Sequence, residues 1–174
     1  MTKIISPFPP IKWIGFDVDG VMTDSGIILD NQKNESKRFN SRDGHGLKML
    51  IRTGLRVAII TGRGSAVVEH RANEVGITEI YQKASDKLVV YQQILEETGL
   101  KPEETAFAGD DIVDLPILIR CGLAMAPADA TKEVLERVHM VTEAKAGHGA
   151  VREMVEYILK GLGLWPDIFA KYIS

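Results

Sequence analysis

Short, almost wholly apolar runs alternate along the chain with longer segments in which apolar residues recur every three or four positions. Short apolar runs of this kind are typical of strands that are buried on both faces of a parallel sheet. We expect such strands at residues 11–16, 56–60, 79–81, 105–108, 123–125 and 139–141. Because the intervening segments have helical periodicity, the pattern predicts a doubly wound, three-layer α/β fold with a parallel sheet. We expect a single domain over residues 1–174.

The expected helices have recognisable ends. Apolar residues recur at helical spacing over 47–51, 88–95 and 151–162, and the third of these is the last helix that the pattern predicts. Asp43 and Ser85 are the expected N-caps of the first two helices, since their short polar side chains can accept hydrogen bonds from free backbone N–H groups. Gly99, followed by Pro102, marks the end of the second helix.

One segment interrupts the alternation. Residues 23–39 hold an apolar stretch at 26–29 and then a polar run at 30–35, which together predict a β-hairpin flap with a polar tip. The flap follows the first strand directly, so it should project over the carboxyl end of the sheet. No insertion is long enough to form a cap domain. The apolar tail, about residues 163–174, is expected to dock on a neighbouring subunit.

Composition narrows the class of protein. The chain is 45% apolar and 26% charged, as in ordinary globular domains, and its net charge of −3 argues against nucleic acid as a partner. The single cysteine, Cys121, cannot form an intrachain disulfide, and its apolar surroundings predict a small buried residue. No apolar run is long enough to span a bilayer, and the N-terminal residues do not have the pattern of a signal peptide. We therefore expect a cytoplasmic protein without a membrane partner.

Polar residues gather where the expected strands end. The sequence Asp17-Val18-Asp19-Gly20 follows the first strand, and three later groups follow other strands: Thr61-Gly62-Arg63, Lys87, and Gly109-Asp110-Asp111 with Asp114. Ligands of open α/β sheets bind outside the carboxyl ends of the strands, so these groups should converge. One aspartate can serve as a nucleophile, its neighbour as a general acid and base, and both can help to hold a divalent cation. The set indicates metal-dependent phosphoryl transfer through an aspartyl-phosphate.

The carboxylates suit Mg²⁺, which prefers an octahedron of oxygen ligands. Asp17 and Asp110 are the expected carboxylate ligands, and the backbone carbonyl of Asp19 is the expected third oxygen. Asp111 and Asp114 are expected to orient water molecules on the metal or the ligands themselves.

Three further residues are expected to act on the phosphate. The charge of Lys87 would lower the pKa of a nearby aspartate and neutralise charge that develops on the phosphate. Thr61 offers a hydroxyl, and Gly62 lets a backbone N–H approach a phosphate oxygen. Each motif alone has a simpler interpretation as a turn, a helix cap or a solvated lysine. Their order and spacing within one α/β pattern favour the functional interpretation.

These motifs resemble a known superfamily. Residues 17–21, Thr61, Lys87 and residues 109–114 look like the four motifs of the haloacid dehalogenase superfamily of phosphatases, and the resemblance covers nearly the whole chain. It implies that Asp17 forms the aspartyl-phosphate and that Asp19 protonates the leaving oxygen and then activates water. Dehalogenase chemistry is disfavoured, because it does not need an acid and base at the position of Asp19.

A narrower resemblance involves residues 19–26, 39–46 and 149–153, which are similar to the capless 3-deoxy-D-manno-octulosonate 8-phosphate phosphatases. It implies a Mg²⁺-dependent hydrolase of a phosphorylated eight-carbon sugar acid on the route to lipopolysaccharide. It also implies a homotetramer, in which hairpins form a barrel and a neighbour's C-terminal segment closes the site. The substrate contacts that it implies are Asp19, Asn40, Ser41, Arg42, Asp43, Gly44, Lys48, Gly62, Arg63, Arg71 and Lys87.

Three other functions fit part of the pattern. A phosphatase of a nine-carbon sugar acid 9-phosphate would share the same catalytic core, and only the hairpin, Arg63, Arg71 and the tail would distinguish it. A phospho-accepting signalling domain also uses Asp, Thr, Lys and Mg²⁺, but it should keep its aspartyl-phosphate, which Asp19 is placed to hydrolyse. An inactive sugar-acid binding protein would not need the intact set of Asp17, Asp19, Lys87 and Asp110.

Overall fold

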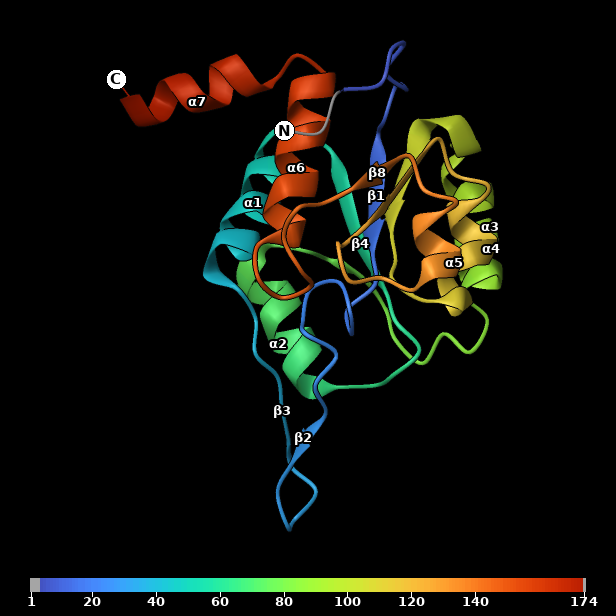
Figure 1. Ribbon diagram of the computed structural model, residues 1–174, viewed down its shortest axis with the longest axis vertical. Helices are drawn as coiled ribbons and strands as arrows, with labels where there is room; N and C mark the ends of the chain where they lie inside the picture. The colour runs from blue at the N-terminus through green and yellow to red at the C-terminus, as the bar shows by residue number, and fades with distance from the viewer. Residues whose placement is uncertain (1–3, 174) are drawn as a thin grey trace.

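A six-stranded parallel sheet forms the centre of the molecule in a computed structural model that describes residues 4–173 (Figure 1). Its strands lie in the order β5-β4-β1-β6-β7-β8. Their bounds are Trp13–Phe16 for β1, Arg56–Ile60 for β4, Glu79–Tyr81 for β5, Thr105–Ala108 for β6, Leu123–Ala126 for β7 and Met140–Val141 for β8. Every pair of neighbouring strands is parallel. The predicted doubly wound α/β fold is confirmed, and the strand ends differ from the expected ones by no more than two residues.

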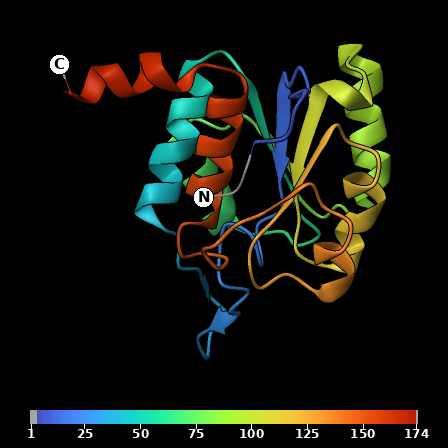
Figure 2. The same cartoon turned by 45° about the horizontal axis from the view of Figure 1, so that its top comes forward.

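Helices cover both faces of the sheet, which gives three layers (Figures 1 and 2). Helices α1 (Ser41–Arg52), α2 (Ala66–Val75) and α6 (Ala150–Gly161) pack on one face, and α3 (Lys87–Thr98), α4 (Leu115–Leu118) and α5 (Lys132–Leu135) pack on the other. Two short 3₁₀ helices, η1 (Pro102–Glu104) and η2 (Ile112–Asp114), flank β6.

Alternating side chains of the strands build the two apolar cores. In β1, Trp13 points into the core under α3, α4 and α5, whereas Ile14 and Phe16 point into the core under α1, α2 and α6. All three side chains are fully buried. Because side chains on a strand alternate between faces, a strand covered on both sides must be apolar throughout. This requirement explains why the short apolar runs predicted the sheet well.

Two predicted helix caps are wrong. The N-cap of α1 is Asn40, whose side chain accepts hydrogen bonds from Arg42 N and Asp43 N, and Asp43 lies inside the helix. The N-cap of α3 is Asp86, one residue after Ser85, and its carboxylate accepts from Leu88 N and Val89 N. Several polar residues before a helix are chemically able to cap it, so the sequence alone did not decide between neighbours. The predicted end of α3 is confirmed, since Gly99 is its C-cap with a φ of 68°.

The prediction of 151–162 as the last helix is also wrong, because the tail forms a further helix, α7 (Trp165–Ile173). Gly163, with a φ of +72°, lies in the turn between α6 and α7. Helix α7 extends away from the body of the molecule (Figures 1 and 2) and has no buried residue. Trp165 and Ile168 rest against the edge of the core, whereas Phe169 and Tyr172 remain exposed.

A small hairpin projects from the carboxyl end of the sheet (Figure 1). Strands β2 (Ile28–Leu29) and β3 (Glu35–Ser36) pair antiparallel, and the Asp30 carboxylate closes the polar tip by accepting from Gln32 N and Asn34 N, each at 2.8 Å. The hairpin thus has the strands and polar tip that the sequence predicts. Within residues 4–173, none of the helices is long and apolar enough to cross a membrane.

Candidate active site

Residues that follow β1, β4 and β6 meet at the carboxyl edge of the sheet, where they line an open pocket of about 620 Å³. This volume is typical of a site for a small molecule. The lining residues come from four separate segments, which the fold brings together: Asp17, Asp19, Ser25, Thr61, Gly62, Arg63, Ala84, Ser85, Asp86, Lys87, Asp110, Asp111, Val113 and Pro116.

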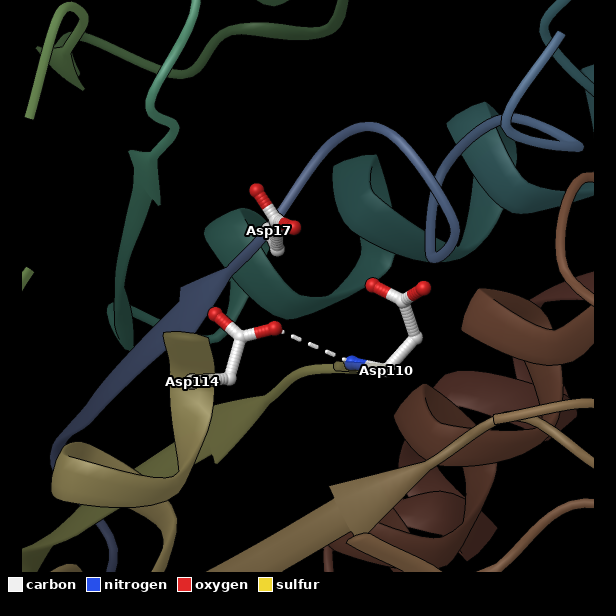
Figure 3. A group of neighbouring side chains, drawn as sticks. All are labelled: Asp17, Asp110 and Asp114. Atoms are coloured by element: carbon white, nitrogen blue, oxygen red, sulfur yellow. Dashed lines mark hydrogen bonds between the residues drawn. The ribbon is translucent and has the colours of Figure 1, made fainter. Parts of the chain in front are cut away.

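Three aspartates form an acidic cluster at this site (Figure 3). One carboxylate oxygen from each of Asp17, Asp110 and Asp114 lies within 4.8 Å of the others. Asp114, on η2, is fully buried, and its Oδ2 accepts hydrogen bonds from Asp110 N at 3.1 Å and Asp111 N at 3.4 Å. Asp114 therefore holds the loop that presents Asp110, and the three carboxylates form an oxygen-rich set that fits a hard divalent cation.

Lys87 provides the positive charge next to this cluster. It is the first residue of α3, and its side chain is 6% exposed. Its Nζ lies 2.9 Å from Asp17 Oδ1 and 2.6 Å from Asp114 Oδ1. Burial alone would lower the pKa of Lys87, but the charges of Asp114 and Asp17 outweigh it and raise that pKa. The lysine is therefore protonated at neutral pH and neutralises part of the acidic cluster.

Asp17 and Asp110 have raised pKa values, because they are buried and lie close to other carboxylates. Burial, followed by the charge of Asp114, raises the pKa of Asp17 to about 6. Burial, followed by the charges of Asp17 and Asp114, raises the pKa of Asp110 to about 7. Crowded carboxylates that resist ionisation in this way are stabilised when a cation binds between them. The raised pKa values and the oxygen donors of the site thus both favour the binding of a divalent cation.

Gly20 is required by the close approach of the loop after β1 to Asp110. Its φ is +91°, and a Cβ placed there would lie 2.0 Å from Asp110 Oδ2. A side chain at position 20 would therefore push the carboxylate of Asp110 away from Asp17.

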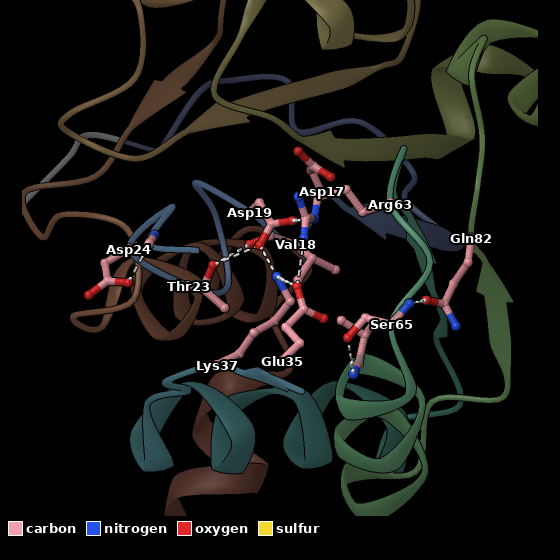
Figure 4. Close-up of polar contacts among 12 residues, drawn as sticks. Asp17, Val18, Asp19, Thr23, Asp24, Glu35, Lys37, Arg63, Ser65 and Gln82 are labelled. Atoms are coloured by element: carbon pink, nitrogen blue, oxygen red, sulfur yellow. Dashed lines mark hydrogen bonds and ion pairs between the residues drawn. The ribbon is translucent and has the colours of Figure 1, made fainter. Parts of the chain in front are cut away.

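The carboxylate of Asp19 has partners of its own (Figure 4). Its Oδ1 accepts a hydrogen bond from Lys37 Nζ, and its Oδ2 lies 3.6 Å from Arg63 Nε. Glu35 contacts both cations, at 2.8 Å from Arg63 Nη2 and 3.4 Å from Lys37 Nζ. Neither Glu35 nor Lys37 was predicted from the sequence. Glu35 begins β3 and Lys37 directly follows it, and this spacing of two residues in an extended segment, which puts both side chains on one face, is the signal that was available.

The loop after β4 completes the phosphate end of the pocket. Thr61 is buried, and its amide donates to Tyr81 O at 2.9 Å, which fixes the loop against β5. Gly62 and Arg63 follow on the exposed wall of the pocket. Asp111 is also exposed, and its Oδ1 accepts from Ile112 N at 2.7 Å.

The other predicted substrate residues lie elsewhere. Asn40, Asp43, Gly44 and Arg71 line a small, separate depression together with Met22, Phe39 and Leu47. Among the described residues, Ser41, Arg42 and Lys48 line neither this depression nor the main pocket.

Within the depression, two of these residues make contacts inside the chain. Asp43 Oδ1 accepts from Arg152 N at 2.8 Å, which joins α1 to the start of α6. Arg71 donates to Asn40 O at 3.3 Å and to Glu74 at 2.8 Å. The structure therefore divides the predicted substrate residues into a set at the pocket and a set on and around α1.

Comparison with known proteins identifies the family. Residues 68–154 match the haloacid dehalogenase-like hydrolases. The chain is also 49% identical over 149 residues to 3-deoxy-D-manno-octulosonate 8-phosphate phosphatase KdsC of Yersinia pestis, an alignment that covers 86% of this chain and 80% of that protein. The chain belongs to the haloacid dehalogenase-like hydrolases. Both resemblances found in the sequence are thereby confirmed, and so is the expected hydrolase class.

Solved structures of family members superimpose over almost the whole chain. A probable YrbI family phosphatase from Pseudomonas syringae has a TM-score of 0.93 and 44% identity, with 95% of this chain and 94% of that chain covered. The 3-deoxy-D-manno-octulosonate 8-phosphate phosphatase of Moraxella catarrhalis, solved with magnesium, phosphate and 3-deoxy-D-manno-octulosonate (KDO), has a TM-score of 0.92 and 35% identity, with 94% of each chain covered. The fold is thus shared with these proteins.

Proposed function

We propose that this protein is a Mg²⁺-dependent phosphatase that hydrolyses 3-deoxy-D-manno-octulosonate 8-phosphate to the free sugar acid and inorganic phosphate. The observation that carries the proposal is the buried contact between Lys87 and the acidic cluster of Asp17, Asp110 and Asp114 at the foot of a pocket of small-molecule size. The substrate is inferred from the relatives, one of which was solved with magnesium, phosphate and KDO.

The first half of the reaction transfers the phosphoryl group to the enzyme. A carboxylate oxygen of Asp17 attacks phosphorus, the bond from phosphorus to the sugar oxygen breaks, and Asp19 gives that oxygen a proton. Lys87 neutralises charge at Asp17, while the Thr61 hydroxyl and the Gly62 amide hold phosphate oxygens. A bound Mg²⁺ would supply further neutralisation of the phosphate. Asp17 and Asp110 would hold the cation with the backbone carbonyl of Asp19, and Asp111 and Asp114 would orient these ligands.

The second half releases phosphate. Asp19 takes a proton from water, the water oxygen attacks the phosphorus of the aspartyl-phosphate, and the bond from phosphorus to Asp17 breaks. The two aspartates thus return to their initial protonation states after each cycle.

The recognition of the sugar acid is assigned to the residues further from the phosphate. We propose that Arg63, on the pocket wall, binds the polar groups of the substrate directly. The residues on and around α1 are proposed to act from a second subunit of a homotetramer: Asn40, Ser41, Arg42, Asp43, Gly44, Lys48 and Arg71. We also propose a cytoplasmic location and a role in the synthesis of lipopolysaccharide precursors, as the family resemblance implies.

The test is a substrate panel with purified protein and Mg²⁺. Phosphate release is measured from 3-deoxy-D-manno-octulosonate 8-phosphate, a nine-carbon sugar acid 9-phosphate and simple sugar phosphates. A kcat/KM at least about a hundredfold higher for the eight-carbon acid, or about 2.7 kcal/mol of discrimination, supports the proposal. Preference for the nine-carbon acid would replace the substrate, and equal rates would leave a general sugar phosphatase.

Two controls separate this activity from contamination and from metal-free catalysis. Asp17→Asn, purified in the same way, should release no phosphate above background. Excess chelator should silence the native protein, and Mg²⁺ should restore it. Activity that persists in excess chelator would contradict the role of the metal.

A further inference from the structure

Several side chains contact the carboxylate of Asp19 in the region between the hairpin and the pocket (Figure 4). Its Oδ1 accepts from Lys37 Nζ and lies 3.4 Å from the Thr23 hydroxyl. Its Oδ2 is the oxygen that lies near the guanidinium of Arg63. Asp19 and Asp17, two residues apart, therefore have separate lysine partners, since Lys87 contacts Asp17 whereas Lys37 contacts Asp19.

The burial of Lys37 is unusual for its position. It directly follows β3, in a hairpin whose residues are mostly exposed, yet its side chain is only 1% exposed. The ammonium group of a lysine in such a segment can reach water without difficulty. It is buried only where carboxylates compensate for the loss of its hydration. Asp19 and Glu35 provide this compensation, the latter at 3.4 Å from Lys37 Nζ.

Glu35 and Arg63 close the arrangement into a ring of four charges. Glu35 Oε1 is 2.8 Å from Arg63 Nη2, and Arg63 in turn faces Asp19. The ring holds two carboxylates and two cations, and it joins three segments: the turn after β1, the end of the hairpin and the loop after β4. We call these residues, Asp19, Glu35, Lys37 and Arg63, the Asp19 ion ring.

We propose that Lys37 is a positioning residue for Asp19, which it orients through Oδ1 so that Oδ2 exchanges the proton with the leaving oxygen. The proposal rests on the proposed function, in which Asp19 is the general acid. Through this contact the end of the hairpin takes part in the chemistry.

The effect should depend on the leaving group. A sugar or alkyl oxygen must be protonated as it departs, whereas p-nitrophenolate departs without a proton. The value of kcat/KM includes only the steps up to formation of the aspartyl-phosphate, so the later use of Asp19 as a base does not enter it. A residue that only supports the fold or binds phosphate affects both kinds of substrate equally.

The experiment compares Lys37→Met with the native enzyme on an alkyl phosphate and on p-nitrophenyl phosphate, both with Mg²⁺. We expect kcat/KM to fall by roughly a hundredfold for the alkyl phosphate, the size of a general-acid effect, and by only a few fold for p-nitrophenyl phosphate. Lys37→Arg, which keeps the charge and the donors, should restore part of the loss. Lys33→Met, at the exposed tip of the same hairpin, should leave both values unchanged. Equal losses on both substrates for Lys37→Met would overturn the proposal.

Two further variants keep the result interpretable. If Lys37→Met does not fold, Lys37→Gln, which removes the charge but keeps a side-chain donor, should show the same selective loss, and equal losses there would overturn the proposal. Asp19→Asn tests the proposed function in the same assay, because a true general acid must also show a loss confined to the alkyl phosphate. A selective loss in Asp19→Asn without one in Lys37→Met would refute the role of Lys37 alone.

Discussion

The ammonium nitrogen of Lys87 lies 2.9 Å from Oδ1 of Asp17, and the two side chains are only 6% and 9% exposed. Charges so poorly hydrated are weakly screened, so each depends on the other. The same nitrogen contacts Asp114, whose carboxylate holds the loop of Asp110. Lys87 therefore links the expected nucleophile to the acidic cluster, and we expect its removal to affect both folding and catalysis.

We predict that Lys87→Met destabilises the metal-free protein by about 3 kcal/mol at pH 8, because the buried carboxylates lose their counter-charge. Denaturant unfolding in the presence of chelator measures this change. Lys132→Met is the matched control, since its side chain is 82% exposed in a surface ion pair and should change stability by less than about 1 kcal/mol. A loss for Lys87→Met no larger than that of the control would contradict the role of Lys87 in stability.

Asp17→Asn should lower turnover by roughly 10³-fold or more, because an amide cannot form the aspartyl-phosphate. The fold should survive, since Asn has the same shape as Asp. It replaces a buried carboxyl group whose pKa is already raised by burial. Phosphate release measures the first effect and thermal unfolding the second. Acid quenching of the native enzyme during turnover should trap one phosphoryl group on residue 17, and a phosphoryl group found on another residue would refute the assignment.

The fold and the pocket were predictable because they follow from periodicity and topology. Runs that are apolar throughout identify strands covered on both faces, and parallel strands bring the residues after them to one edge. This is why Asp17, Thr61 and Asp110 could be expected together before their geometry was known. The presence of Lys87 in the same pocket, at the first position of α3, follows from the same rule, since that helix also begins at the carboxyl edge.

Other features depend on contacts between segments that the sequence does not relate to one another. Asp43 reads as a helix cap, but its carboxylate accepts from Arg152 N, 109 positions further along the chain. Lys37 lies at the end of a mostly exposed hairpin, and its burial comes from its contact with Asp19, 18 positions earlier in the chain. Local propensity cannot predict such contacts, because they arise from the packing of separate elements.

Asp43 provides a prediction about pH. Burial raises the pKa of Asp43 above the ordinary aspartate value of 3.8, so the folded protein binds a proton at this carboxyl group more tightly than the unfolded chain does. The stability that the neutral carboxyl contributes is therefore lost as pH rises from about 3.8 through the folded pKa. Asp43→Asn, which does not ionise and keeps an acceptor for Arg152 N, should gain in melting temperature relative to the native protein as pH rises from about 4 to 7. A difference that is constant or decreases over this range would show that the Asp43 carboxylate is stabilised in the fold.

Helix α7 provides the last prediction. Its side chains Phe169, Tyr172 and Ile173 are 47%, 51% and 69% exposed, and we expect a second copy of the chain to cover this apolar surface. Ending the chain after Gly163 should therefore reduce the oligomer, measured as mass in solution. It should also lower kcat/KM for the phosphorylated sugar acid more than for p-nitrophenyl phosphate, because a tail that closes a neighbouring site contacts only the larger substrate. Phe169→Glu should reproduce part of both effects, whereas Ile119→Glu, at a position 59% exposed elsewhere, should show neither. Unchanged mass and kinetics after truncation would refute the docking of this tail.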